Sequence, residues 1–168
     1  TTASILMTAF ATISSILTNS KIKRITRTTS FDIRKIPKEK TIIYLKYPEY
    51  SEQYDGLVSL VLTELIHVLY HSCDQTGQLD IPFHFIIDEF AHFRLPSFER
   101  YISTARSRNI KFTLLIQSID QLEIGYSKSV AQTIMDCCQN IISFQTTNYN
   151  TLTYMSQLSG YRDTVGNL

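Results

Sequence analysis

Two adjacent acidic residues, Asp88 and Glu89, directly follow the largely apolar run Phe83–Ile87. Two carboxylates beside a buried run are unfavourable unless they meet water, a metal ion or a positive partner. In a site that hydrolyses a phosphate bond, Asp88 would hold Mg²⁺ and Glu89 would polarise the attacking water. The alternative interpretation is that the two acids only mark the point where a strand leaves the core.

A polar amide, Gln117, follows a second apolar run, Phe112–Ile116, and Arg106 lies eleven residues before it. The Gln117 amide has both donor and acceptor atoms, so it can read a γ-phosphate or orient a water molecule. The Arg106 guanidinium is always charged and binds phosphate oxygens through paired N–H groups. Both residues also have an ordinary interpretation, as a polar strand end for Gln117 and as charge compensation at a helix C-terminus for Arg106.

Other reactive residue types form weaker patterns. His67 and His71 are four residues apart on a predicted helix, one turn after Glu64, which is a spacing that zinc ligands use. No further ligand accompanies them, so surface or core histidines are favoured. Cys137 and Cys138 are adjacent and are interpreted as packed small side chains. With three cysteines and no C-x-x-C pair, the chain resembles neither a disulfide scaffold nor a zinc ribbon, and a reducing intracellular setting is favoured.

The elements that position these residues follow from apolar periodicity and from proline and glycine positions. Strands are predicted at residues 41–47, 83–87, 112–116 and 141–144. Helices are predicted at residues 1–18, 56–71, after Pro96, 129–138 and 150–158, with an irregular stretch up to residue 40. Strands that alternate with helices predict an α/β fold with a mostly parallel sheet and flanking helices. Because ligands bind beyond the carboxyl ends of such strands, Asp88, Glu89 and Gln117 are expected to lie together.

The chain has 168 residues and a formal net charge of +1, which fits one domain of ordinary size. No run reaches the roughly 18 apolar residues that a membrane span needs, so a soluble chain is expected. The charge is uneven, because residues 21–40 hold eight basic and two acidic side chains. Such a segment can contact nucleic-acid phosphates or anionic lipid, and the alternative is a solvated loop.

A combination of segments is more specific than any one residue: Phe85–Phe90, Arg94–Pro96, Ser103–Ile110, Leu114–Ser118, Gln121–Leu122 and Tyr154–Gly160. Together they resemble the type IV secretion coupling proteins, the TraG/TraD-like ATPases of conjugative DNA transfer. The resemblance covers at least residues 83–160, and residues 1–17 and the run at residue 41 are similar more loosely.

This resemblance implies a RecA-like P-loop NTPase domain that forms a homohexamer at the cytoplasmic face of the bacterial inner membrane. Such a motor uses ATP and Mg²⁺ to deliver single-stranded DNA, with its relaxase and other relaxosome proteins, to a type IV secretion channel. By the same resemblance, Asp88 and Glu89 match the Walker B acids, with Asp88 at the metal. Gln117 matches a γ-phosphate sensor, and Arg106 matches a residue that reaches a neighbouring subunit's nucleotide.

The sequence departs from this family in one respect, because no G-x-x-x-x-G-K-[ST] phosphate loop occurs in it. Residues 41–168 are therefore expected to be the C-terminal part of the motor domain, preceded by a helix and a basic irregular segment at residues 1–40. The chain alone is expected to bind no ATP and to be inactive, whereas the full-length protein would be an ATPase. Two alternatives are a non-catalytic module that binds relaxosome or secreted proteins, and a metal-dependent nuclease that uses Asp88 and Glu89.

Overall fold

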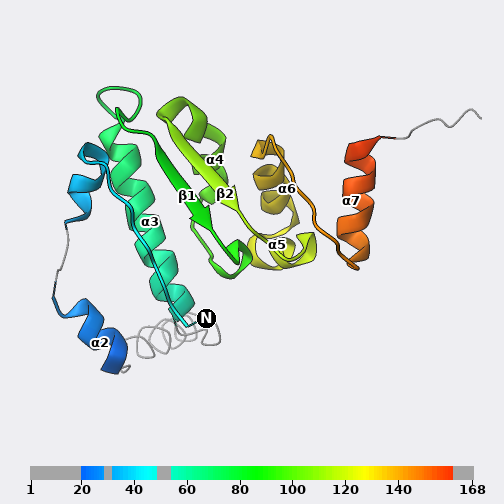
Figure 1. Cartoon of the computed structure of the whole chain (residues 1–168), viewed down its shortest axis with the longest axis horizontal. Helices are drawn as coiled ribbons and strands as arrows, with labels where there is room; N and C mark the ends of the chain where they lie inside the picture. The colour runs from blue at the N-terminus through cyan, green and yellow to red at the C-terminus, as the bar shows by residue number, and fades with distance from the viewer. Residues whose placement is uncertain (1–19, 29–31, 49–53, 161–168) are drawn as a thin grey trace, which may run out of the picture. The chain divides into compact units, whose positions relative to one another are not determined.

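The computed structural model describes residues 20–28, 32–48 and 54–160 of the chain (Figure 1). The chain divides into two compact units, which we describe separately. Unit 1 contains the residues up to Phe83 together with Ser107–Ile110, and unit 2 contains His84–Arg106 and the residues from Lys111 onward. The helix predicted at residues 1–18 lies outside the described residues, and the predicted boundary at residue 40 stays a prediction.

Unit 1 is built around the long helix α3 (Asp55–Ser72), which confirms the helix predicted at residues 56–71. Its buried residues recur every three or four positions and form one apolar stripe: Val58, Leu62, Leu65, Ile66 and Leu69. The short helix η1 (Ile33–Lys38) packs against α3 and buries Ile36. Together with α2 (Ser20–Thr26), η1 shows that the predicted irregular stretch was wrong in part. Asp32 caps η1 by accepting a hydrogen bond from the Arg34 backbone N–H.

Two strands make up the sheet in the described part of the chain: β1 (Phe83–Ile87) and β2 (Ile110–Leu114). At one end the Phe83 N–H donates to the Asn109 carbonyl (3.1 Å). At the other end the Leu115 N–H donates to the Ile87 carbonyl (2.9 Å), so both strands run in the same direction. The α/β class and the parallel pairing are therefore confirmed. β1 has its predicted bounds, whereas β2 begins two residues before its predicted start.

The strands predicted at residues 41–47 and 141–144 were wrong, and the sheet is smaller than expected. Neither segment pairs with another strand in the described part of the chain. Their apolar side chains face solvent, with exposed fractions of 78% for Ile42, 89% for Tyr44, 80% for Ile142 and 86% for Phe144. Strand propensity reflects how well a side chain fits a half-buried pleated surface, and these segments have no such surface to join.

The helices of unit 2 are η3 (Phe90–His92), α4 (Phe98–Ala105), α5 (Ile119–Tyr126), α6 (Lys128–Cys137) and α7 (Tyr149–Ser159), and η4 (Arg106–Arg108) leads into β2. The predictions for α4, α6 and α7 are confirmed, and Gly160 ends α7 as expected. Helix α5 was not predicted. It packs on η3, α6 and α7 and is therefore the central helix of this unit. None of the described helices is long and apolar enough to cross a membrane.

Aromatic rings form the centre of unit 2: Phe85, Phe90, Phe98, Phe112 and Tyr126. Phe98 of α4 contacts Phe112 of β2 edge-on, with ring centroids 5.1 Å apart, and contacts Phe90 at 4.8 Å. Phe90 stacks on Tyr126 of α5 at 5.2 Å. Such pairs add about 0.5–1.5 kcal/mol beyond the burial of their area. The cluster thereby joins the sheet, α4 and α5 around Phe90, the residue that follows Glu89.

Tyr126 also fixes the loop between η3 and α4. Its hydroxyl donates to the Phe93 carbonyl and accepts from the Leu95 N–H at 3.1 Å. Burial raises the pKa of the Tyr126 hydroxyl far above its ordinary value, because the anion would lose its hydration. The neutral hydroxyl therefore serves as a fixed donor and acceptor at any physiological pH.

Helix α5 approaches η3 so closely that only glycine fits at the contact. A Cβ atom added to Gly125 would lie 2.7 Å from the Ala91 carbonyl oxygen, a distance that real Cβ atoms do not adopt. The obstacle is backbone, so relief requires movement of a whole element. Gly125 therefore sets the distance between α5 and η3.

We predict that Gly125→Ala lowers the free energy of unfolding by about 1–3 kcal/mol, because α5 must move away from η3. The matched control is Gly56→Ala in α3, where an added Cβ meets nothing within 4 Å. That control is expected to raise stability by about 0.5–1 kcal/mol through helix propensity. Thermal unfolding followed by circular dichroism checks both variants. An unchanged midpoint for Gly125→Ala would contradict the close contact.

Candidate functional site

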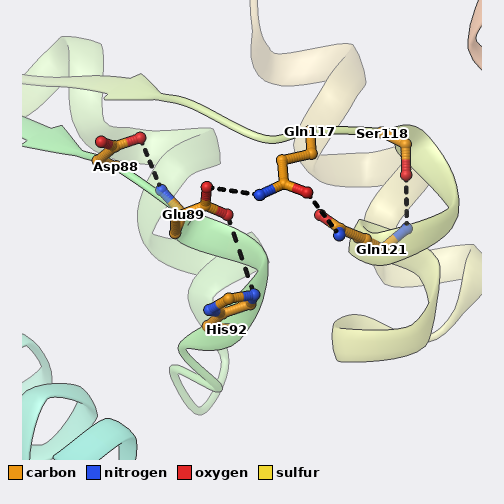
Figure 2. Close-up of polar contacts among 6 residues, drawn as sticks. All are labelled: Asp88, Glu89, His92, Gln117, Ser118 and Gln121. Atoms are coloured by element: carbon orange, nitrogen blue, oxygen red, sulfur yellow. Dashed lines mark hydrogen bonds and ion pairs between the residues drawn. The ribbon is translucent and has the colours of Figure 1, made fainter. Parts of the chain in front are cut away.

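The side chains of Glu89 and Gln117 meet beyond the carboxyl ends of β1 and β2 (Figure 2). Gln117 Nε2 donates to Glu89 Oε1 at 2.7 Å. The strand ends are held in register by Leu115, whose N–H donates to Ile87 (2.9 Å) and whose carbonyl accepts from Phe90 (3.0 Å). The predicted proximity of Glu89 and Gln117 is therefore confirmed, whereas their roles toward a nucleotide stay predictions.

A third polar residue, Gln121, extends this contact into α5. Gln121 Nε2 donates to Gln117 Oε1 at 3.1 Å, so the three side chains form the chain Glu89–Gln117–Gln121. Ser118 caps α5 by accepting from the Gln121 N–H at 3.3 Å (Figure 2). Gln117 precedes the N-cap residue Ser118, and Gln121 lies in the first turn of α5, so the start of the helix brings the two side chains together.

Glu89 has an unusual backbone and one unsatisfied oxygen. Its φ of 50° and ψ of 39° lie in the left-handed region, which costs about 1–2 kcal/mol for a residue other than glycine. Such conformations cluster at functional sites. Its Oε2 atom is buried and accepts no hydrogen bond within the described part of the chain, and the His92 Nε2 atom lies 3.9 Å from it. This oxygen is available to a ligand or to water.

Asp88 is separate from the chain Glu89–Gln117–Gln121. It is exposed, and Figure 2 shows its carboxylate turned back over the Glu89 backbone. Its Oδ1 accepts from the Glu89 N–H at 3.0 Å. That bond leaves the other oxygen open to solvent. The Asp88 carboxylate is thus at the surface, whereas the Glu89 carboxylate accepts a hydrogen bond from the Gln117 side-chain amide.

Arg106 lies at the opposite end of the sheet from Gln117. It caps the C-terminus of α4 and is exposed, just before β2 begins. The five residues of β2 span roughly 16 Å, so one chain does not bring its Arg106 to the Glu89–Gln117 pair. A role of Arg106 toward a neighbouring subunit, as the resemblance implies, stays a prediction.

Asp88 is suited to bind Mg²⁺ as a single carboxylate ligand, and not as one member of a site made entirely of protein ligands. The described residues contain no group of three or more His, Cys, Asp or Glu side chains placed to hold a metal ion. Mg²⁺ often binds one or two carboxylates and completes its shell with water and substrate phosphates. An exposed aspartate with one open oxygen suits that mode. The nuclease alternative needs a third carboxylate near Asp88 and Glu89, and the described residues do not place one there.

The two histidines of the zinc-like spacing have different partners, one within α3 and one just after it. His67 Nδ1 lies 4.0 Å from Glu64 Oε1, and His71 Nδ1 lies 2.7 Å from Asp74 Oδ2. All these side chains are largely exposed. The interpretation as surface histidines is therefore favoured by their geometry.

A second hydrogen-bond group ties the start of α5 to the start of α7. The Asp120 carboxylate accepts from Asn148 Nδ2 and from Asn150 Nδ2, both at 2.7 Å. These two donors lower the pKa of Asp120, because they stabilise its ionised form. Asn148 also caps α7 by accepting from the Thr151 N–H at 2.8 Å. Helix α7 is thus held at its N-terminus by α5, although it buries no residue fully.

The roles of Gln121 and Asp120 were not predicted from the sequence, because no helix was predicted at α5. A signal was present, since Ser118 followed by Gln121 is the S-x-x-Q spacing of a capping box. With the helix start placed at Ser118, the i and i+4 relation of Gln117 and Gln121 would have followed. The Asp120 contacts would not, because Asn148 lies 28 residues away.

Comparison with known proteins identifies the region that contains this site. Residues 82–167, about half of the chain, match the family described as the TraM recognition site of TraD and TraG. No curated protein and no solved structure gave a significant match. The family match includes both strands, Glu89, Gln117 and α5, and it confirms the resemblance drawn from the sequence. The chain therefore belongs to the TraD/TraG coupling-protein family and contains its C-terminal TraM recognition region.

Proposed function

We propose that this chain is the C-terminal part of a RecA-like motor domain, and that Glu89 and Gln117 form part of its ATP site. One observation carries the proposal: the 2.7 Å hydrogen bond between these side chains, at the carboxyl ends of parallel strands, in a chain of the coupling-protein family. Parallel α/β sheets bind their ligands at that edge. The motor would deliver relaxase-bound single-stranded DNA to a type IV secretion channel.

Each side chain of the site has a chemical role in this proposal. Gln117 donates to Glu89 Oε1, so the buried Oε2, which accepts no hydrogen bond within the described part of the chain, is the oxygen that would accept a proton from the attacking water. The Gln117 amide would exchange its bond to Glu89 for one to a γ-phosphate when ATP is bound. Asp88 would hold Mg²⁺, which supplies charge neutralisation at the phosphates.

An open sheet face supports the proposal that this is part of a larger domain. Parallel sheets are normally covered on both faces, yet the Ile86 side chain in the middle of β1 is 70% exposed. The sequence also lacks a phosphate loop. In the proposed motor, further strands and the phosphate loop complete the domain, and Arg106 reaches the nucleotide of the next subunit in a homohexamer. Such a motor would work at the cytoplasmic face of the inner membrane.

The main test is Glu89→Gln in the full-length coupling protein. The variant keeps the size of the side chain but removes the proton acceptor, so ATP turnover should fall at least about 100-fold while ATP binding persists. The control is Glu123→Gln in α5, a glutamate outside the Glu89–Gln117–Gln121 chain. Turnover and binding of a fluorescent ATP analogue are measured in parallel. Unchanged turnover in Glu89→Gln would remove the proposed ATP site.

The basic segment of unit 1 is the proposed contact to single-stranded DNA. Lys23, Arg24 and Arg27 are exposed on and after α2, whereas Arg34 is paired with Asp32 at 2.9 Å. Charge reversal at Arg24 and Arg27 should weaken DNA binding and lower its salt dependence, because fewer counterions are released. The matched control is Lys128→Glu in α6. Salt titrations of fluorescent oligonucleotide binding that are identical for the wild-type chain and the double variant would contradict this contact.

A second candidate function is recognition of a relaxosome protein of the TraM type, and the family description favours it. Residues 137–160 contain no Asp, Glu, Lys or Arg, and several of their apolar side chains are exposed, including Ile142, Phe144 and Tyr149 at 78–86%. Exposed apolar patches of this kind mark interaction sites. This function is compatible with the ATP site, because the two use different residues.

We predict that Phe144→Ser combined with Tyr149→Ser reduces capture of the TraM-type partner at least about tenfold, because two large contact residues are lost. ATP turnover of the full-length protein should be unchanged. The control is Ile42→Ser, which alters a similarly exposed side chain of unit 1. Binding is measured by titration of the purified partner. Wild-type affinity in the double variant, or loss of binding only when residues 1–40 are removed, would contradict this function.

A further inference from the structure

We infer that Gln121 is a positioning residue that fixes the orientation of the Gln117 amide toward Glu89. This inference rests on the proposed ATP site, since it assigns a third residue to it. The observation behind it is the continuous series of two hydrogen bonds, 2.7 Å from Gln117 to Glu89 and 3.1 Å from Gln121 to Gln117.

The direction of these bonds follows from the chemistry of their groups. An ionised carboxylate only accepts hydrogen bonds, so Glu89 selects the NH₂ side of the Gln117 amide. The carbonyl oxygen of that amide is thereby turned toward α5 and requires a donor. Gln121 Nε2 supplies it. Without this donor, the Gln117 amide would lose the hydrogen bond by which α5 favours one of its two orientations over the other.

In this arrangement one buried atom of the Gln121 side chain lacks a hydrogen bond. Its Oε1 is buried and accepts no hydrogen bond within the described part of the chain. A buried acceptor without a partner is unfavourable, because it has lost its hydrogen bonds to water. Reversing the Gln121 amide would place an oxygen against the Gln117 oxygen and lose the 3.1 Å bond. The side chain is therefore held in its present orientation by Gln117 and not by its own surroundings.

The backbone around Gln121 is rigid enough for a positioning role. Its N–H is bound by the Ser118 cap at 3.3 Å, in the first turn of α5. Four residues later Gly125 contacts the Ala91 backbone of η3, the element that begins just after Glu89. Both ends of the series Glu89–Gln117–Gln121 thus belong to elements in direct contact.

The orientation matters for the proposed reaction because only one side of the Gln117 amide can donate. Toward a γ-phosphate or a carboxylate, the NH₂ group is attractive and the oxygen is repulsive. A neutral hydrogen bond is worth about 1 kcal/mol, so its loss should lower kcat about fivefold to tenfold. KM for ATP should change less than about threefold, because Gln121 itself does not touch the nucleotide.

The test compares Gln121→Met with Gln121→Glu in the full-length protein. Methionine has a similar shape and no donor, so it should give the moderate loss in kcat. The carboxylate of Gln121→Glu can only accept and meets the Gln117 oxygen, so its loss in kcat should be larger at about pH 8. When that carboxyl is protonated it becomes a donor, so kcat relative to the wild type should recover as the pH falls toward about 4.3, the ordinary pKa of a glutamate side chain.

Native ionisable groups do not account for such a recovery. The series itself contains Glu89, which is paired with His92 of η3. Asp120 of α5 binds Asn148 and Asn150 at the start of α7, and Asp136 of α6 accepts from Gln132 of the same helix. All of them are also present in the wild type, so a pH effect that acts through them alone changes kcat in the wild type as well. The matched controls are Gln132→Met and Gln132→Glu, which alter a similar glutamine in α6.

The outcomes separate the two proposals. If Glu89→Gln abolishes turnover while both Gln121 variants keep wild-type kcat, the positioning role is overturned and the ATP site stands. If Glu89→Gln leaves turnover unchanged, the ATP site itself fails. A loss of kcat in Gln121→Glu that does not recover at low pH would also overturn the positioning role, since misfolding would give a loss independent of the protonation of that carboxyl. Recovery in Gln121→Glu, with none in Gln132→Glu, supports the inference.

Discussion

The candidate site depends on two backbone hydrogen bonds of Leu115. Its N–H donates to Ile87 and its carbonyl accepts from Phe90, so one residue after β2 holds both sides of the turn that contains Asp88 and Glu89. This pairing sets the separation of the two strand ends. Two residues later, Gln117 is then within hydrogen-bond distance of Glu89. The side-chain contact is a consequence of the backbone register and would be lost if β2 slipped by one residue.

The left-handed conformation of Glu89 is maintained by the packing on either side of it. Phe90 is fully buried against Phe98 and Tyr126, and Gly125 allows α5 to approach Ala91. These contacts anchor η3, so the turn before it has little freedom to relax. Burial of one aromatic ring contributes about 1.5–3 kcal/mol, which is enough to offset the cost of about 1–2 kcal/mol for one left-handed residue. The core of unit 2 therefore stabilises a site that is locally unfavourable.

The features that could be predicted from sequence were those set by local patterns. Helix α3 and strand β1 were correct because their buried residues follow the period of the element. The segments at residues 41–47 and 141–144 have strand-like composition, but a strand also requires a distant partner, which composition does not reveal. Glu89 and Gln117 were predicted to meet because parallel strands end at the same edge. The conformation of Glu89 and the contacts of Asp120 depend on tertiary packing, so no local pattern predicted them.

Helix α5 connects the two surfaces to which functions are proposed. Gln121 contacts Gln117 at the strand ends, and the preceding residue, Asp120, binds Asn148 and Asn150 at the start of α7. The backbone hydrogen bonds of α5 fix Asp120 and Gln121 relative to each other in its first turn. Any displacement of α5 that lengthens the Gln117–Gln121 bond therefore also strains the Asp120 contacts. A coupling between sites requires an element that both of them bias, and α5 is the element in this unit that contacts both.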